Sequence, residues 1–389
     1  MDARGVTNPQ VMYGADIISR VQYIIEDKSD KYELRDKVVD TINKTIKEMC
    51  QQMKISPYDI LEATIVGNTV MHHIFLGLPL EQLVTAPFVC VTTEPWEIKA
   101  RDLRINIYQG GYVYFPSLIG GFIGSDHTAM ILASRLYQKK KICLGIDIGT
   151  NTEITLKTNE GLYACSCASG PAFEGGSIEY GMRAGPGAIH RVKINPKTFI
   201  PSYQTIDRSP PVGLCGSGII DAVSEMVKTG ILNSRGRLKK GIKGVTESPE
   251  GKGEFLLVPR KNTADGLPIT ITQKDISQVQ LAKGAIQTGI SILLHQAKVK
   301  TDMIQEILLA GAFGNYLSPQ SAINIGMLPP NKKVINIGNA AGKGGQELLL
   351  SKKKRKLAEK ISRQVKYIEL SVYPHFSQTF AHSLKFPIL

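Results

Sequence analysis

The clearest hydrophobic pattern lies near the middle of the chain, where two apolar runs flank a short polar turn. Residues 142–146 are apolar throughout, which predicts a buried strand, and the apolar pattern resumes at residues 154–156. The intervening residues, 147–152, are mostly glycine and polar types. We therefore predict two strands joined by a tight turn, and we expect the rest of the chain to be organised around this pair.

The turn has the composition of a phosphate-binding loop. Gly149 lacks a Cβ, so a ligand can approach the backbone closely, and successive main-chain N–H groups in such a turn form a nest for phosphate oxygens. Thr150, Asn151 and Thr152 add side-chain donors. Asp147, at the strand end, is suited to hold Mg²⁺ through water, because Mg²⁺ keeps most of its hydration shell. The alternative is a plain hairpin whose aspartate caps the turn.

A second strand-to-helix junction lies upstream. A strand at residues 63–66 is followed by a predicted helix over 70–75. The helix N-terminus favours an anion, or Thr69 is simply its N-cap. His72 and His73 are adjacent, and adjacent helical side chains point about 100° apart. We therefore expect one histidine to face the core and the other to face solvent, and we predict no metal site there.

Two further carboxylates lie in glycine-rich segments and are candidates for catalysis. Asp126 precedes a predicted helix over 128–136 and is either a helix cap or a carboxylate of the magnesium site. Glu174 follows a third predicted strand, 161–168, in a loop of small residues that includes Gly170. Glu174 orients an attacking water, contacts magnesium or only caps the loop. We predict Asp126 and Glu174 as catalytic residues and Gly170 as part of the cofactor site.

A glycine-rich motif follows another predicted buried strand, at residues 306–310. Glycine leaves room for a flat ligand against the backbone, which is what adenine or ribose requires. We therefore predict a nucleoside site at Gly311, Ala312, Phe313 and Gly314. Residues 338–345 form another glycine-rich crossing, and we assign its Asn339 to the cofactor site.

The composition is that of an ordinary globular protein. The chain has 389 residues, 42% hydrophobic and 21% charged, which is enough for two domains with substantial cores. It has no apolar stretch of the ~18 residues that a membrane helix needs, and residues 1–9 lack the apolar core of a signal peptide. We therefore expect a cytoplasmic protein with no membrane partner.

The six cysteines are scattered and include no Cys-x-x-Cys spacing. An iron–sulfur or zinc site built by this chain alone is therefore not expected. Cys165 and Cys167 are two positions apart in a predicted strand, so they should share one face. Cys215 precedes Gly-Ser-Gly at the start of a predicted helix, where it is either a reactive thiol or a small residue that allows tight packing.

The formal net charge is +13 and the pI is about 9.3, a balance that favours an acidic partner or a polyanion. Much of the excess lies in short lysine runs, of which residues 351–356 lead into a helix. A solvated helix face is the simplest interpretation of that run. No nucleic-acid-binding module accompanies these runs, so we expect no nucleic-acid partner.

The order of the predicted elements resembles the second lobe of the actin, hexokinase and Hsp70 superfamily. The resemblance implies an α/β fold with two ribonuclease-H-like lobes, the first incomplete at its N-terminus. We assign residues 1–140 to the first lobe and 141–389 to the second. In that superfamily nucleotide sits in the cleft between the lobes, and residues 120–129 and 338–345 resemble the two hinges.

Several short sequence motifs, taken together, resemble those of the reductive activators of corrinoid enzymes. They are Val66-Gly-Asn-Thr-Val-Met-His-His, Asp147-Ile-Gly-Thr-Asn-Thr-Glu, Ala168-Ser-Gly-Pro-Ala-Phe-Glu-Gly, Cys215-Gly-Ser-Gly-Ile-Ile-Asp, Leu309-Ala-Gly-Ala-Phe-Gly-Asn-Tyr and Gly338-Asn-Ala-Ala-Gly. The resemblance implies an ATP- and Mg²⁺-dependent ATPase that helps return a corrinoid protein of a methyl-transfer system from Co(II) to Co(I).

Two features of the family are missing from this sequence. The cysteines of a ferredoxin-like [2Fe–2S] domain are absent, and so is an earlier Asp-x-Gly-Thr phosphate loop. We therefore expect a truncated or split gene product whose ferredoxin-like electron donor is separate or missing. A homodimer is also allowed for. Two alternatives stay open: a nucleotide-dependent binding module that does not hydrolyse ATP, and a small-molecule kinase of the same superfamily.

Overall fold

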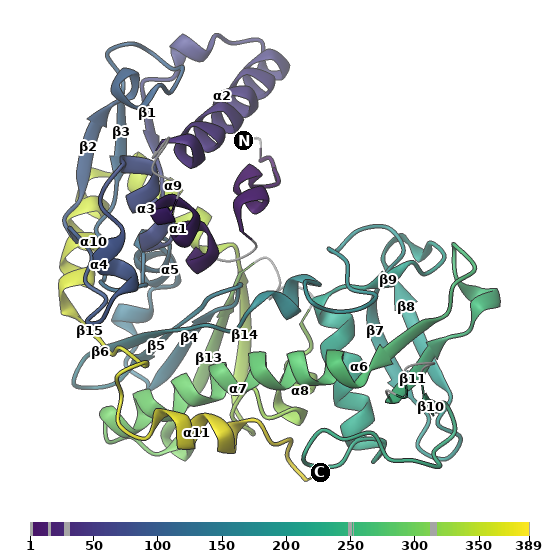
Figure 1. Cartoon of the computed structure of the whole chain (residues 1–389). Helices are drawn as coiled ribbons and strands as arrows, with labels where there is room; N and C mark the ends of the chain where they lie inside the picture. The colour runs from purple at the N-terminus through teal and green to yellow at the C-terminus, as the bar shows by residue number, and fades with distance from the viewer. Residues whose placement is uncertain are drawn as a thin grey trace. The chain divides into compact units, whose positions relative to one another are not determined.

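The computed structural model describes residues 3–14, 17–26, 32–247, 251, 253–311 and 317–388 (Figure 1). The chain forms two compact units, which are described separately below. Unit 1 consists of Met1–Lys139, Glu160–Tyr163 and Asn339–Tyr367, and unit 2 of Lys140–Asn159, Ala164–Gly338 and Ile368–Leu389. The predicted lobes, 1–140 and 141–389, stay a prediction; the units differ from them because residues 339–367 belong to unit 1.

Unit 1 combines a small sheet with helices from both ends of the sequence. Its strands are β1 (Glu62–Thr64), β2 (Trp96–Lys99), β3 (Tyr112–Phe115) and β15 (Val365–Tyr367). Its helices are α1 (Ile17–Glu26), α2 (Glu33–Met53), α3 (Thr69–Leu76), α4 (Glu81–Val84), α5 (Ser125–Ser134), α9 (Ala340–Leu350) and α10 (Lys352–Gln364). Strands β1, β2 and β3 form the small sheet, in the order β1-β3-β2, with β1 parallel and β2 antiparallel to β3.

The C-terminal helices of unit 1 are fixed to this sheet by one buried arginine. Arg355 of α10 forms ion pairs with Glu62 of β1 at 2.6 Å and with Glu97 of β2 at 3.0 Å. Its guanidinium also lies 4.4 Å from the ring centroid of Tyr114 on β3. A single side chain thus contacts all three strands, and Figure 1 shows α10, in yellow, beside β2. Arg355 and Glu97, 258 positions apart in sequence, therefore belong to one unit.

Helices α5 and α9 pack against each other so closely that glycine is required at the contact. A Cβ on Gly344 of α9 would collide with the carbonyl oxygen of Ala129 on α5. The neighbouring Gly345 has room, because its nearest neighbours would be the Val66 methyl groups at 3.7 Å.

The prediction for the paired histidines was wrong. Both are buried on α3, with His72 at 4% and His73 at 0% exposure. His73 is held through both ring nitrogens, since Nδ1 lies 2.8 Å from the Thr69 carbonyl and Nε2 accepts from Val91 N–H at 3.0 Å. His72 packs edge-on against Phe115, and burial lowers its pKa to about 4. The helix is enclosed on more than one side, so a 100° separation leaves neither ring in solvent.

Unit 2 is larger and contains the strand pair predicted at the centre of the chain. Its main strands are β4 (Cys143–Asp147), β5 (Thr152–Lys157), β6 (Leu162–Cys167), β13 (Glu306–Ala310) and β14 (Lys333–Gly338), in the order β14-β13-β4-β5-β6. The first two residues of β6 belong to unit 1. Strands β4, β13 and β14 are mutually parallel, and β4 and β5 form an antiparallel hairpin. The predicted strand–turn–strand is confirmed.

The long helix α7 (Gln273–Gln296) packs on this sheet across a glycine. A Cβ on Gly289 would lie 3.1 Å from Cys165 Sγ and would collide with Cys167 Sγ. Both cysteines therefore point to α7 from one face of β6, as their spacing predicted. Cys215 is also buried, and its thiol lies 3.3 Å from the Ile189 carbonyl oxygen, a contact that matches the packing alternative.

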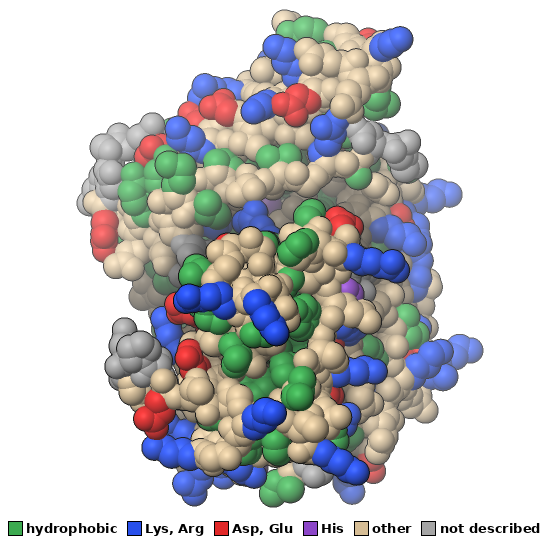
Figure 2. Space-filling view, turned by 90° about the vertical axis from the view of Figure 1, so that its right-hand side faces the viewer, with side chains coloured by type: hydrophobic (Ala, Val, Ile, Leu, Met, Phe, Trp, Pro, Cys, Tyr) green, Lys and Arg blue, Asp and Glu red, His purple; other side chains and the backbone are tan. Residues whose placement is uncertain are grey.

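Two smaller sheets extend unit 2, with orders β8-β7-β9 and β10-β11-β12. Their strands are β7 (Ala188–Ile194), β8 (Pro201–Thr205), β9 (Gly213–Leu214), β10 (Val245–Glu247), β11 (Gly253–Val258) and β12 (Ile269–Thr272), accompanied by helices α6 (Gly216–Lys228), α8 (Pro319–Asn324) and α11 (Phe376–Ser383). Figure 2 shows lysine and arginine side chains spread among hydrophobic and uncharged atoms on the face in view, not gathered into one patch.

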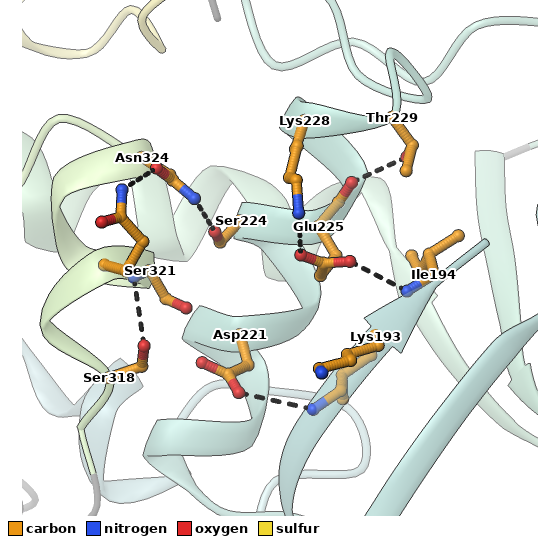
Figure 3. Close-up of polar contacts among 12 residues, drawn as sticks. Lys193, Ile194, Asp221, Ser224, Glu225, Lys228, Thr229, Ser318, Ser321 and Asn324 are labelled. Atoms are coloured by element: carbon orange, nitrogen blue, oxygen red, sulfur yellow. Dashed lines mark hydrogen bonds and ion pairs between the residues drawn. The ribbon is translucent and has the colours of Figure 1, made fainter. Parts of the chain in front are cut away.

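Carboxylates on α6 satisfy part of the edge of β7 (Figure 3). Asp221 accepts from Val192 N–H at 3.4 Å, and Glu225, one turn further along, accepts from Ile194 N–H at 3.0 Å. Ser224 joins the same helix to α8 by accepting from the Asn324 amide at 3.1 Å. Unpaired strand N–H groups are costly when buried, so these bonds explain why polar side chains occur on a largely buried helix.

The C-terminal tail of unit 2 lies along α7 over a buried lysine. Lys283 has no exposed surface, and its ammonium group donates to the Lys385 carbonyl and lies 5.4 Å from the Phe386 ring centroid. Burial lowers the pKa of Lys283 to about 8.

Among the described residues, none of the helices has the length and apolar composition that a membrane span needs.

Replacing Gly344 by alanine should destabilise the protein by about 1–3 kcal/mol, the usual cost of overpacking a closed contact. The matched control is Gly345→Ala, one position further along the same helix, which should be neutral or stabilising because alanine favours the helix and finds open space. Urea unfolding of both variants measures the difference. Equal midpoints would contradict the close packing of α5 on α9.

The pH dependence of stability should change in Lys283→Met. The folded pKa of Lys283 is about 8, below its ordinary value of 10.5, so the unfolded chain binds more protons between these values and wild-type stability rises with pH across that window. The integrated gain is about 3 kcal/mol. Urea titrations of both proteins from pH 7 to 10.5 should show the difference; parallel curves would contradict the burial of a charged lysine.

Candidate functional site

The ends of three parallel strands bring the predicted phosphate loop and Gly311, the first residue of the predicted nucleoside motif, to one edge of the sheet in unit 2. Asp147, the last residue of β4, is aligned with Ala310, the last residue of β13. Gly311 N–H donates to the Gly338 carbonyl at the end of β14, at 3.0 Å. Ligands in α/β sheets bind outside the carboxyl ends of parallel strands, so this edge is the candidate site.

The loop after β4 has three consecutive main-chain amides that donate to no acceptor among the described residues. Ile148 N–H donates to the Ala310 carbonyl at 3.3 Å and ties the loop to β13. The N–H groups of Gly149, Thr150 and Asn151 have no protein acceptor in the part of the chain that the structure describes, and all three residues are half-buried. Consecutive free amides of this kind form an anion-binding nest.

The loop carbonyls are held on the opposite side by the segment after β6. Ser169 Oγ donates to the Gly149 carbonyl at 3.0 Å, and Gly170 N–H donates to the Thr150 carbonyl at 2.9 Å. In a planar trans peptide the carbonyl and the following N–H point in opposite directions. Fixing these two carbonyls therefore turns the amides of Thr150 and Asn151 away from Ser169 and Gly170.

The predicted catalytic residue Glu174 lies at the same loop. It ends the short 3₁₀ helix η5 (Pro171–Glu174), is exposed, and accepts a hydrogen bond of 2.6 Å from the Thr150 hydroxyl. Gly170 adopts φ +74° with open space where a Cβ would be. The structure thus brings Glu174, Gly170 and Thr150 together, while their roles in catalysis and cofactor binding stay predictions.

Two hydroxyls beneath the loop support it. Thr152, a predicted ligand, is fully buried, and its hydroxyl lies 2.7 Å from Ser169 Oγ. Sequence reasoning missed Ser169, which is 4% exposed and bonds three groups of the loop. Its sequence signal was a small hydroxyl residue directly before Gly170-Pro171, but its partner strand could not be identified from spacing.

Gly311 closes the other side of the site. It adopts φ +97°, and a Cβ there would lie 2.6 Å from the Ile148 carbonyl oxygen and 3.1 Å from Asp147 Oδ1. Only glycine leaves this space beside the aspartate. The remaining predicted nucleoside residues, Ala312, Phe313 and Gly314, lie outside the described residues.

The donor set around this space fits a magnesium ion that brings its own water. No cluster of three or more His, Cys, Asp or Glu side chains suited to a metal occurs among the described residues. Mg²⁺ bound with nucleotide needs only one or two carboxylates, because phosphate and water supply the other ligands. Asp147, half-buried at the strand end, meets that requirement; its magnesium role stays a prediction.

Asp126 and Asn339 belong to unit 1, where each is at a helix start. Asp126 is the second residue of α5, and its carboxylate accepts from His127 N–H at 2.8 Å. Burial raises the pKa of Asp126 to about 6, although the hydrogen bonds from the backbone oppose the change. Asn339 caps α9 by accepting from Gly342 N–H at 2.8 Å. Their predicted catalytic and cofactor roles stay predictions.

Comparison with protein-family models assigns the whole chain. Residues 141–389 match the model described as the C-terminal domain of RACo, the ASKHA domain, and residues 1–139 match the RACo middle region. The chain belongs to the RACo family. The predicted actin/hexokinase/Hsp70-type fold and the predicted resemblance to reductive activators of corrinoid enzymes are thereby confirmed.

Named relatives and a solved structure agree with this assignment. The chain is 35% identical to the corrinoid activation enzyme RamQ of Eubacterium limosum, over 99% of this chain and 66% of the relative. It is 27% identical to the [Co(II) methylated amine-specific corrinoid protein] reductase of Methanosarcina barkeri, over 80% of this chain and 60% of the relative. A solved reductive activator for corrinoid,iron-sulfur protein matches with a TM-score of 0.89 and 34% identity, over 98% of this chain and 61% of that one.

The chain therefore spans between 60% and 66% of the length of these relatives. The matched part of the RACo family includes the ASKHA domain, in which the loop after β4 lies. The family assignment thus covers the candidate site.

Gly311→Ala should weaken nucleotide binding more than Gly170→Ala does. Both glycines have positive φ, so both substitutions strain the backbone, but only a Cβ at position 311 presses on Asp147 and Ile148. We expect Gly311→Ala to lower the affinity for Mg²⁺-ATP by about tenfold or more, equivalent to about 1.4 kcal/mol, with Gly170→Ala close to wild type. Calorimetric titration measures both, and equal losses would contradict the proximity of Gly311 to the ligand.

Proposed function

We propose that this chain is the ATP-binding core of a system that returns a corrinoid protein from the Co(II) to the Co(I) state. The family assignment and the names of the relatives support the corrinoid partner. The observation that supports nucleotide binding is the row of three amides after Asp147, for which the described residues provide no acceptor.

Each residue of the site has a separate task in this proposal. The amides of Gly149, Thr150 and Asn151 bind phosphate oxygens, and Asp147 orients the water shell of Mg²⁺. In this proposal Glu174 orients an attacking water; its exposure and its 2.6 Å hydrogen bond from the Thr150 hydroxyl support that role. Bound Mg²⁺-ATP supplies a leaving group and the free energy that drives the cycle.

The link to corrinoid reduction is thermodynamic. Reduction of Co(II) to Co(I) adds one electron, which in this proposal comes from a separate low-potential donor. The proposal gives this chain no cluster of its own, because its six cysteines are scattered and include no Cys-x-x-Cys spacing. If the nucleotide-bound chain binds one oxidation state of its partner tenfold more tightly, the partner's potential changes by ~59 mV, or ~1.4 kcal/mol.

A nucleotide-dependent binding module is the remaining alternative, because binding alone already changes the potential of the partner. Turnover distinguishes the two, since a module releases no phosphate with or without the corrinoid protein. The structure offers no observation that favours a small-molecule kinase, which needs a general base beside an acceptor hydroxyl.

Asp147→Ala should lower ATP affinity only when Mg²⁺ is present. Because Asp147 acts through the hydrated ion, we expect a loss of about tenfold or more with Mg²⁺ and little change in EDTA. Asp102→Ala, at a carboxylate of unit 1 with 62% exposure, is the charge-matched control and should bind as wild type. Calorimetry under both conditions is the measurement; a loss that is equal in EDTA would remove Asp147 from the magnesium role.

The activity is tested with the methylated amine-specific corrinoid protein named for the second relative, prepared in the Co(II) state with a low-potential chemical reductant. Absorption spectra should show Co(I) forming faster with ATP than with ADP or no nucleotide, and Asp147→Ala should abolish the difference. Equal rates under all three conditions would overturn the proposal.

A further inference from the structure

One helix carries nearly half of the net charge of the chain. Helix α10, 13 residues long, contains seven basic residues and one acidic residue, a net charge of +6 against +13 for all 389 residues. Neither the nucleotide site nor the core of unit 1 uses most of these cations. Their positions on the helix show what they could do.

The cations occupy one side of the helix. At about 100° per residue, five positions fall within about 100° of arc and extend over about 16 Å. All five side chains are exposed, and we call them the basic stripe: Lys352, Lys353, Lys356, Lys360 and Arg363. The opposite side of α10, with Arg355, Ala358 and Ile361, is buried in unit 1. The stripe is therefore displayed on a rigid helix.

Most of the stripe is not neutralised by the protein. Arg363 pairs with Glu94 at 2.7 Å, but Lys352, Lys353, Lys356 and Lys360 form no ion pair in the described part of the chain. Three of these four, Lys352, Lys353 and Lys356, lie within about 6 Å of the N-terminus along the helix axis, at ~1.5 Å per residue. Their charges add to the positive potential of the helix dipole.

This arrangement works against the stability of the helix. Cations are unfavourable in the first turn, and like charges three or four residues apart repel each other. The first turn of α10 contains no acidic residue at all. Positions that break local rules without a structural gain are where function is expected, and here the gain is a concentrated positive potential.

An apolar side chain stands at the start of the stripe. Leu350, the last residue of α9, is 77% exposed, and Leu349 beside it is 36% exposed. An apolar contact next to charged residues is typical of protein–protein interfaces. A membrane is a less suitable ligand of the stripe than a protein, because the apolar side of α10 already packs inside unit 1 and cannot enter a bilayer. Single-stranded nucleic acid is a less suitable ligand, because the stripe includes no aromatic side chain on which a base could stack.

We infer that the basic stripe and Leu350 form the docking surface for an acidic face of the corrinoid protein. The inference rests on the proposed function, which requires a folded protein substrate to bind, react and leave. Charge complementarity suits that requirement, because it raises association rates and sets orientation without making the complex permanent. Leu350 supplies the short-range contact that slows dissociation.

The test compares two triple variants of equal charge change. Lys353→Glu/Lys356→Glu/Lys360→Glu reverses the stripe, and Lys37→Glu/Lys44→Glu/Lys47→Glu reverses three exposed lysines on α2 of the same unit. Association with the Co(II) methylated amine-specific corrinoid protein is followed over a series of salt concentrations. We expect the stripe variant to associate about tenfold more slowly at low salt, with a flatter salt dependence, and the α2 variant to stay within about twofold of wild type.

Two further measurements separate docking from folding. The stripe variant should unfold at the same urea concentration as wild type or a higher one, because the substitutions relieve repulsion, and it should bind Mg²⁺-ATP normally. Leu350→Ser should speed dissociation without changing the salt dependence. Equal slowing by both triple variants, or none by either, would overturn the docking surface.

These measurements distinguish failure of the docking surface from failure of the proposed function. Normal activation and binding by the stripe variant would remove the stripe and leave the proposed function intact. No binding of the corrinoid protein by wild type would remove both. Tighter stripe-dependent binding of duplex DNA, or of phosphatidylserine vesicles, than of the corrinoid protein would overturn the inference in favour of that ligand.

Discussion

The candidate site depends on where two carbonyl groups point. Ser169 and Gly170 hold the carbonyls of Gly149 and Thr150 at 3.0 and 2.9 Å, and the planarity of the peptide then sends the following amides the other way. Without that support, a loop of glycine and small polar residues would sample many conformations, and each free amide would be solvated separately. The support comes from the segment after β6, so the nest exists only when the sheet has formed.

The same dependence extends outward through the sheet. Strand β6, which leads into the supporting segment, packs against α7 through Cys165 and Cys167 across Gly289. On the other side, Gly311 leaves space beside Asp147 that any side chain would fill. Three glycines with different roles therefore shape one site: Gly149 in the nest, Gly289 in the packing of α7 and Gly311 beside the carboxylate. A sequence scan that counts glycines treats them alike, whereas their contacts distinguish them.

Sequence patterns predicted the features that depend on neighbouring residues and missed those that depend on contacts between segments far apart in the sequence. The strand pair around Asp147 and the shared face of Cys165 and Cys167 follow from alternation over a few residues, and both are present. Ser169 and the burial of both histidines could not be predicted, because each depends on neighbours far away in sequence, such as Val91 against His73. Residues 339–367 join unit 1 through Arg355, whose partners Glu62 and Glu97 carry no local signal.

Helix α10 shows how one run of basic residues divides into two physical roles. Arg355 is buried and fully engaged with two carboxylates, a carbonyl and a ring, so its charge is balanced and it specifies the packing of unit 1. Lys352, Lys353, Lys356 and Lys360 of the basic stripe face solvent on the other side of the helix and form no ion pair in the described part of the chain. Helical periodicity alone separates the two sets, but only the contacts of Arg355 show which side is the inside. The repulsion among the stripe lysines destabilises α10, whereas Arg355 stabilises unit 1, so a binding partner explains the stripe better than the fold does. For a partner that must dissociate again, charge complementarity is more suitable than a large apolar interface, because it speeds association without making the complex permanent.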